Sequence, residues 1–277
     1  MITQILRFAY HSRCNGCIVM KVSHARESSS SAGLYEMMQR GSVYVDIFGP
    51  EKPGADYIEK AVRELALAMP QHKVNSYFMA KPETIARTDL CLFCYTKETN
   101  ECCGFLSCNV AEIAGKTCIM LYTLLISEKQ HGTRVTYSIL QSLFSTLSQK
   151  IGLDYEYIIL KTVNPRSFKI LASFSDIQNS AFFPQILLSN DNELADFSIQ
   201  LANYLHPGFR YNKKNGVIYN ASGEVPDDFY QQMPQCRDAV VNEFFSANLT
   251  LSDRMICILH LSDANARAQL YSRFKVI

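Results

Sequence analysis

The sequence predicts an α+β or α/β fold in which a mixed, mainly antiparallel sheet is flanked by helices. Three strand-length apolar runs between residues 90 and 126 are separated only by short polar turns, which is typical of an antiparallel meander. The next segment, Thr133–Ile151, carries apolar residues at the spacing of an amphipathic helix. It is followed by Tyr155–Val163, which has few charges and is expected to be a strand buried on both faces. This order favours helices layered on a sheet.

Composition narrows the class of protein. The chain has 277 residues, of which 48% are hydrophobic and 19% charged, as in a folded globular protein. Its formal net charge is +1, whereas nucleic-acid-binding proteins typically carry a marked excess of positive charge. We therefore expect no nucleic-acid partner. Met1–Tyr10 is too short an apolar run for a signal peptide, and no run reaches the length of a membrane span. We therefore expect a cytoplasmic protein without a membrane partner.

The ten cysteines are consistent with a reducing compartment. Two pairs, Cys14–Cys17 and Cys91–Cys94, have the spacing of zinc ligands, and a zinc-stapled interaction protein is one hypothesis. Cys91 and Cys94, however, lie within an apolar strand-like run, where residues three apart face opposite sides. Free cysteine also packs as a small hydrophobe. The positions of these cysteines therefore predict no metal site.

The elements before the meander begin at Val43, and residues 1–41 are treated as an N-terminal extension in which Gly16–Val22 could form a strand. Val43–Phe48 is a strand candidate that ends in a turn rich in Gly and Pro. Asp56–Met69 has one apolar and one charged face, which predicts a helix that Pro70 ends. A less regular helical stretch follows, over about Ser76–Arg87.

The predicted core spans residues 42–180. Its meander strands are Leu90–Tyr95, Cys102–Ile113 and Thr117–Ile126, and a short helix, Ser167–Phe174, follows the buried strand. Residues 181–277 are predicted to be a C-terminal α/β extension that could complete the same sheet. Its expected elements are a strand at Ala181–Leu188, a helix at Asp191–Leu205 with Asn190 and Glu193 as a capping box, a hairpin at Phe209–Tyr219, a helix at Arg237–Ala247, a strand at Arg254–Leu261 and a helix at Asp263–Tyr271.

The segment from Lys116 to Ile151 runs from a buried strand, through a loop containing glycine, into a helix. The first turn of a helix leaves backbone N–H groups without partners and carries a partial positive charge. Such a junction can bind an anion, and phosphate is a common occupant. The alternative interpretation is an ordinary connection between a strand and a helix.

Within this segment, Ser127–Leu140 (SEKQHGTRVTYSIL) resembles the loop and helix of the GNAT superfamily of acyl-CoA-dependent N-acetyltransferases. The family pattern there is Arg-Gly-x-Gly-x-Gly/Ala. In this chain His131 stands at the arginine and Gly132 at the first glycine, while Arg134 and Thr136 stand at the other two glycines. The order of strands and helices resembles the same family. A second, weaker resemblance is TVNPRSFKILASF, where the family often has Asn after the next strand.

The resemblance implies that the loop holds the pyrophosphate of CoA, that the preceding strand offers its main chain to the pantetheine arm, and that a V-shaped opening between this strand and the next admits the acceptor amine. The residues so implied are Gln130, His131, Gly132, Thr133, Arg134, Val135 and Thr136 for the pyrophosphate, Leu124, Leu125 and Ile126 for the pantetheine, and Asn164 for the thiol end.

Catalytic residues are harder to assign. The strand Thr117–Ile126 carries no Asp or Glu, so Tyr122 is its one side chain suited to proton transfer, and Glu112 on the preceding strand is a second candidate base. The tyrosine acid usual in the family is replaced by Leu171, and water could relay the proton instead. The resemblance thus implies an N-acetyltransferase that uses acetyl-CoA as cosubstrate and acetylates an unidentified amine, either a small molecule or a protein. The alternative is a catalytically degenerate GNAT-fold binding or regulatory module.

Overall fold

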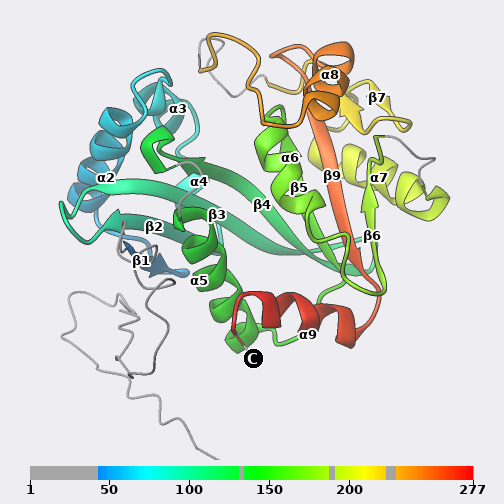
Figure 1. Cartoon of the computed structure of the whole chain (residues 1–277), viewed down its shortest axis with the longest axis horizontal. Coiled ribbons are helices and arrows are strands. Elements are labelled where there is room, and N and C mark those ends of the chain that lie inside the picture. Colours follow the sequence, from blue (N-terminus) through cyan, green and yellow to red (C-terminus); the bar gives the residue numbers. More distant parts are fainter. Residues whose placement is uncertain (1–42, 131–133, 187–190, 223–228, 277) are drawn as a thin grey trace, which may run out of the picture.

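The computed structural model describes residues 43–130, 134–186, 191–222 and 229–276. Within these residues one nine-stranded sheet has the order β1-β2-β3-β4-β5-β9-β8-β7, and β6 also pairs with β9 (Figure 1). The strands are β1 Val43–Phe48, β2 Leu90–Thr96, β3 Cys102–Ile113, β4 Lys116–Ile126, β5 Tyr157–Thr162, β6 Ser180–Phe183, β7 Tyr211–Asn212, β8 Val217–Ile218 and β9 Arg254–Leu261. The helices are α2 Ala55–Ala68, α3 Val74–Ala80, α4 Glu83–Ala86, α5 Val135–Lys150, α6 Pro165–Ala172, α7 Asn192–Leu205, α8 Ala239–Asn248 and α9 Ala264–Arg273.

The predicted mixed, mainly antiparallel sheet is confirmed. β1 to β4 pair antiparallel in succession, β4 and β5 are parallel, and β5 pairs antiparallel with β9. A parallel pair needs a long crossover, and α5 supplies it between β4 and β5. β6, β7, β8 and β9, all from the last hundred residues of the chain, lie in the same sheet as the meander.

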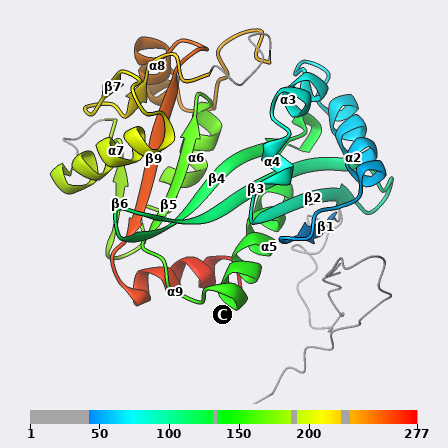
Figure 2. The same ribbon diagram turned by 180° about the vertical axis from the view of Figure 1, so that it is seen from behind.

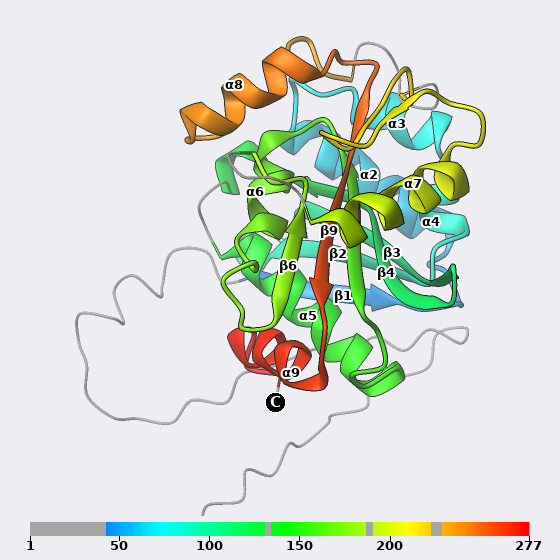
Figure 3. The same cartoon turned by 90° about the vertical axis from the view of Figure 1, so that its right-hand side faces the viewer.

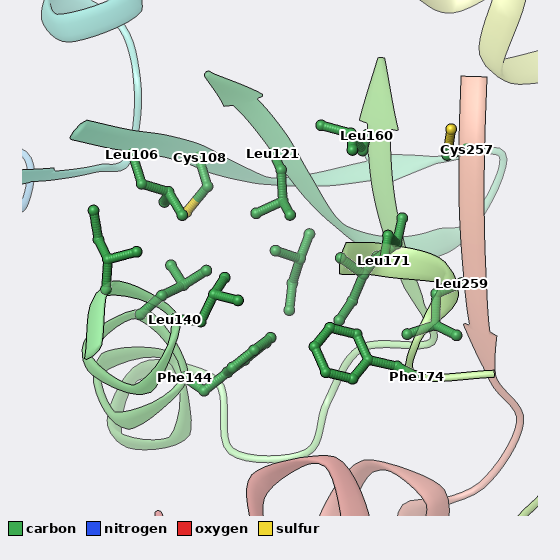
Figure 4. Close-up of a cluster of buried hydrophobic side chains, with 14 of the residues drawn as sticks. Leu106, Cys108, Leu121, Leu140, Phe144, Leu160, Leu171, Phe174, Cys257 and Leu259 are labelled. Atoms are coloured by element: carbon green, nitrogen blue, oxygen red, sulfur yellow. The ribbon is translucent and has the colours of Figure 1, made fainter. Parts of the chain in front are cut away.

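Helices cover both faces of the sheet, as Figure 3 shows for α5, α6 and α9 on one side and α2, α3 and α7 on the other. The core under α5 and α6 takes side chains from β3, β4, β5 and β9, including Leu106, Leu121, Leu160 and Leu259, which lie in the same cluster as Phe144 of α5 (Figure 4). On the other face, α2 and α3 cover β1 to β3, and α7 covers β4, β5 and β9. The apolar stripes of the predicted helices therefore fill two layers, one on each face.

A β-bulge divides β4 into two parts. Ser107 of β3 lies opposite Thr123, but the next residue of β3, Cys108, lies opposite Leu121, so Tyr122 is an extra residue. One extra residue reverses the faces to which the following side chains point. Leu121 accordingly packs in the core under α5, whereas Leu125, four residues later, packs in the core under α2.

The bulge coincides with the end of the pairing between β4 and β5. Cys118–Leu121 pair with Tyr157–Leu160, and the pairing goes no further along β4. Beyond it, Tyr122–Ile126 run beside β3, while Lys161 and Thr162 at the end of β5 pair with β9. Figures 1 and 2 show β4 turning toward α3 while β5 stays beside β9. The strands thus enclose a V-shaped opening.

Several element boundaries differ from the sequence prediction because of caps. α6 begins at Pro165 and not at Ser167, since Asn164 caps it and its Oδ1 accepts a hydrogen bond of 2.9 Å from the N–H of Arg166. The cap of α7 is Asp191, whose carboxylate accepts from the N–H groups of Glu193 and Leu194, whereas the predicted cap Asn190 lies outside the described residues. The strand predicted at Ala181–Leu188 is shorter, ending as β6 at Phe183.

The two cysteines of β2 face opposite sides of the sheet, as their spacing predicts. Cys94 packs in the core under α5 and Cys91 in the core under α2. Cys14, Cys17 and the strand predicted at Gly16–Val22 lie outside the described residues. In the part of the chain that the structure describes, no group of three or more His, Cys, Asp or Glu is placed to hold a metal ion. Nor does any helix in those ranges have the length and apolarity needed to span a membrane.

Candidate active site

The opening between β4 and β5 holds two adjoining cavities. The larger, of about 290 Å³, is lined by the end of β4, the first turn of α5, the start of α6, the loop after α2 and residues 230–235. The smaller, of about 90 Å³, lies between α3, the same part of β4, the end of β5 and the start of β9. Leu124, Leu125, Ser167 and Tyr230 line both cavities, so the two meet at these side chains.

A wider hollow of about 770 Å³ lies elsewhere, beside the turn after α7 and the loop after α8. Its charged side chains already have partners. The guanidinium of Arg210 lies over the ring of Tyr219, and the carboxylate of Asp253 accepts hydrogen bonds from Asn220 and Thr250. This hollow brings together no group suited to catalysis, so the candidate site is the opening in the sheet.

The structure brings several of the predicted cofactor-binding residues to one cavity. Leu124, Leu125 and Ile126 line the larger cavity together with Thr136 of α5 and Asn164 at the start of α6.

The remaining predicted binding residues lie around the start of α5. Gln130 ends a short 3-10 helix, Glu128–Gln130, and Val135 is buried in the core under α5. Arg134 is exposed at the N-cap of α5. His131, Gly132 and Thr133, the centre of the predicted phosphate loop, are outside the described residues.

Arg134 occupies the N-cap position of α5, and its side chain accepts no hydrogen bond from the first turn. Helix α5 starts close above β3, because a Cβ atom on Gly104 would lie 3.3 Å from a methyl carbon of Val135 and 3.1 Å from Ile126. Since Thr136 in the same turn lines the larger cavity, the first-turn N–H groups lie at the edge of that cavity.

The two predicted catalytic residues lie in different places. Tyr122, the extra residue of the bulge, lines the smaller cavity and is 42% exposed. Glu112 is exposed near the other end of the hairpin, where it lies opposite Thr117. Along an extended strand, Thr117 and Leu124 are separated by roughly 20 Å. The structure therefore brings Tyr122, but not Glu112, to the opening.

Four aromatic rings at the opening were not singled out by the sequence. His72, Tyr77, Phe229 and Tyr230 come from three segments, and the ring centroid of Phe229 lies 5.3 Å from His72, 5.1 Å from Tyr77 and 4.8 Å from Tyr230. Phe229 and Tyr230 lie in a stretch without regular secondary structure, so no helical or strand periodicity in the sequence points to them. His72 likewise lies in a loop, just after the end of α2. Only the tertiary structure gathers these rings.

Tyr230 lies where the two cavities meet. It lines the larger cavity together with Asn164, and burial raises the pKa of its hydroxyl. Because a raised pKa keeps the group protonated at neutral pH, Tyr230 remains a proton donor there. At the position on the helix after Asn164 where the GNAT pattern has a tyrosine acid, this chain has Leu171, which is buried in the core. Tyr230 brings a hydroxyl next to Asn164 from a distant segment.

His72 presents its imidazole ring to the larger cavity. Its Nδ1 atom is buried and makes no hydrogen bond within the described residues, and the same is true of Nε2 of the neighbouring Gln71. Buried polar atoms normally have partners, and one without a partner often marks the place of a water or ligand. His72 is therefore suited to accept a proton from a bound molecule.

Comparisons with known proteins complete the description. No protein-family model and no curated protein sequence matches this chain. Its fold is similar to solved structures of GNAT-family acetyltransferases. One, from Elizabethkingia anophelis with acetyl-CoA bound, is 12% identical, with a TM-score of 0.32, covering 79% of this chain and 98% of the other. One from Staphylococcus aureus is 10% identical, with a TM-score of 0.34, covering 52% and 88%. One from Escherichia coli in complex with CoA is 14% identical, with a TM-score of 0.34, covering 55% and 76%.

Proposed function

We propose that this protein is an N-acyltransferase that transfers an acetyl group from acetyl-CoA to an amine. The observation that carries the proposal is the edge of β4 beyond the bulge. Among the described residues no strand pairs with Tyr122–Leu125 on the side of β5, and Leu124, Leu125 and Ile126 border the larger cavity. An extended chain with amide groups, such as pantetheine, can add to such an edge through main-chain hydrogen bonds.

The phosphates and the thioester of a bound acetyl-CoA would contact different groups of the protein. Its phosphates would lie at the start of α5, where the partial positive charge of the first turn and the side chain of Arg134 favour an anion. Its thioester would lie where the two cavities meet, beside Asn164 and Tyr230. The smaller cavity would then hold the acceptor, on the far side of that meeting point.

The proposed reaction needs one proton acceptor and one proton donor. The amine nitrogen attacks the thioester carbonyl, a C–N bond forms, and the C–S bond breaks with its electron pair leaving on sulfur. His72 would take the proton lost from the amine nitrogen, directly or through water. Tyr230 would give a proton to the thiolate as it leaves and be reprotonated from solvent. Tyr122, at the acceptor side, is the further candidate for handling the amine proton.

Thermal unfolding with and without acetyl-CoA tests the cofactor. At a ligand concentration of one hundred times Kd, binding to the folded state adds about 2.7 kcal/mol to the free energy of unfolding and raises Tm. Arg134→Gln should reduce this rise, and Arg63→Gln on the exposed face of α2 is the matched control for loss of a positive charge. A Tm that does not move at millimolar acetyl-CoA would refute the proposal.

Product analysis tests the reaction itself. Incubation with acetyl-CoA and a panel of amines should release CoA, and mass spectrometry should show an acetylated amine. If acetyl-CoA raises Tm but no amine in a broad panel is acetylated, the chain is instead a binding or regulatory module that keeps the cofactor site.

A further inference from the structure

Arg254, the first residue of β9, is a buried cation in the smaller cavity. Its side chain lines that cavity, and the residue is 6% exposed. Nη1 donates hydrogen bonds to the carbonyl oxygens of Leu251, at 2.8 Å, and Asp253, at 2.6 Å. Nε and Nη2 make no hydrogen bond to any described residue. The backbone thus holds the guanidinium on one side, and its other donors have no partner among the described residues.

The nearby carboxylate does not pair with Arg254. Asp253 uses its side-chain oxygens to accept hydrogen bonds from the N–H and hydroxyl of Thr250 and from the N–H of Asn220. Among the described residues no Asp or Glu lies within ion-pair distance of the Arg254 guanidinium. A buried charge is costly unless a partner compensates it, so this arrangement favours an anionic ligand.

The walls of the smaller cavity suit a small anion. The hydroxyls of Tyr77 and Thr123 lie 2.6 Å apart, and both side chains line the cavity with Arg254. Lys161 and Lys81 also line it, with Lys161 Nζ at 2.5 Å from Nε2 of His206. No Asp or Glu occurs among its described lining residues. The cavity therefore combines positive charge with hydroxyl groups.

The position of the cavity identifies the molecule that would carry the anion. It adjoins the larger cavity at Leu124, Leu125, Ser167 and Tyr230, where the proposed thioester would lie. The planar fork of arginine matches a carboxylate through two parallel hydrogen bonds. A molecule that places a carboxylate on Arg254 would reach back toward the thioester from the acceptor side.

We propose that the acyl acceptor is an amine that carries a carboxylate, and that Arg254 binds this carboxylate in the smaller cavity. This inference rests on the proposed function for the identity of the reaction, but the carboxylate site itself can be measured without any reaction.

Calorimetric titration provides that measurement. Glycine, β-alanine and 4-aminobutyrate place the amine at increasing distance from the carboxylate, and the carboxamide of each is the neutral match. Each pair is titrated into the full chain saturated with CoA, which lacks the acetyl group and so cannot react. We expect at least one acid to bind at least about tenfold more tightly than its carboxamide, as befits a hydrogen-bonded charged pair.

Variants of Arg254 test whether its guanidinium causes the tighter binding of the acid. Arg254→Gln should bring the ratio of the two affinities close to one, and Arg254→Lys, which keeps the charge without the fork, should give an intermediate ratio. Arg63→Gln should leave the ratio unchanged. The rise in Tm on adding CoA shows that each variant is folded, because the CoA site does not include Arg254.

The outcomes separate the two proposals. Preferential binding of an acid that depends on Arg254, without any acetylated product when acetyl-CoA replaces CoA, would support the carboxylate site and contradict acetyl transfer. Acetylation of carboxamides as fast as of acids would support the reaction and overturn this inference. The inference is also overturned if no acid in the series binds better than its carboxamide, or if Arg254→Gln keeps the preference.

Discussion

The two parts of β4 differ although they belong to one strand. Cys118–Leu121 are paired on both sides, with β3 and with β5, whereas among the described strands Thr123–Leu125 pair with β3 and not with β5. Ile119 in the first part is completely buried, whereas Tyr122 at the bulge is 42% exposed. A single extra residue thus turns a closed sheet into an open one: the bulge bends the strand, the parallel pairing stops, and a stretch of β4 without a partner in β5 borders a cavity.

The largest effect should come from truncating the closed part. Ile119→Ala removes a buried side chain that lies opposite Val110 on one side and Ile158 on the other, so we expect a loss of about 2–5 kcal/mol in the free energy of unfolding. Leu124→Ala in the open part should cost less than half of that, because Leu124 is partly exposed, but it should weaken the binding of acetyl-CoA. Urea unfolding of both variants measures the difference, and equal losses would contradict the distinction between the two parts.

The next effect concerns the proton acceptor at the opening. His72→Gln keeps a polar side chain but removes the imidazole that would take the amine proton, so kcat/KM should fall about a hundredfold. His260→Gln is the control, because His260 stacks on Tyr157 in the closed part of the sheet. An unchanged kcat/KM in His72→Gln would assign the proton to another group.

A smaller effect is expected from the proton donor. Tyr230→Phe keeps the ring contacts with His72 and Phe229 and removes only the hydroxyl, so kcat should fall about tenfold while KM for acetyl-CoA stays the same. Tyr137→Phe, whose hydroxyl donates to the carbonyl of Arg273 away from the opening, should keep full activity. If Tyr122→Phe reduces kcat more than Tyr230→Phe does, the main proton-handling role belongs to the bulge residue.

The smallest effect is a pH dependence of stability that comes from His260 of β9, which pairs with the closed part of the sheet at Tyr157 of β5. Burial lowers the pKa of His260 from its ordinary value of 6.5, so the unfolded chain binds the proton more readily than the folded one. Stability should therefore fall as the pH is lowered through 6.5 toward the folded-state pKa. Urea midpoints at pH 7.5 and 5.5 should differ less in His260→Gln than in the parent chain, and an unchanged difference would exclude this histidine as the cause.

Much of the fold could be predicted because its elements have local signals. The helix of α5 follows from the spacing of Ile139, Leu143 and Leu147, which are all buried against the sheet. The meander follows from short turns between apolar runs. Caps were less readable, as Asp191 in place of Asn190 shows, because adjacent polar residues compete for the same role and only backbone geometry selects one.

The candidate site could be predicted only in part. The resemblance to the GNAT family implies Leu124, Leu125, Ile126 and Asn164 as binding residues, and the structure places all four on one cavity. The segments that carry His72, Tyr230 and Arg254 were not connected to the site by any pattern, because their distance along the chain hides their closeness in space.

The order of strands and helices can be predicted from the sequence, since hydrophobic period and turn residues are local properties. The place where the sheet opens depends on the packed fold. Lys116–Ile126 is apolar on both faces, so its pattern contains no alternation that would reveal the change of phase at Tyr122. The phase is set by which core each side chain enters, Leu121 under α5 and Leu125 under α2, and those cores exist only once the helices have packed.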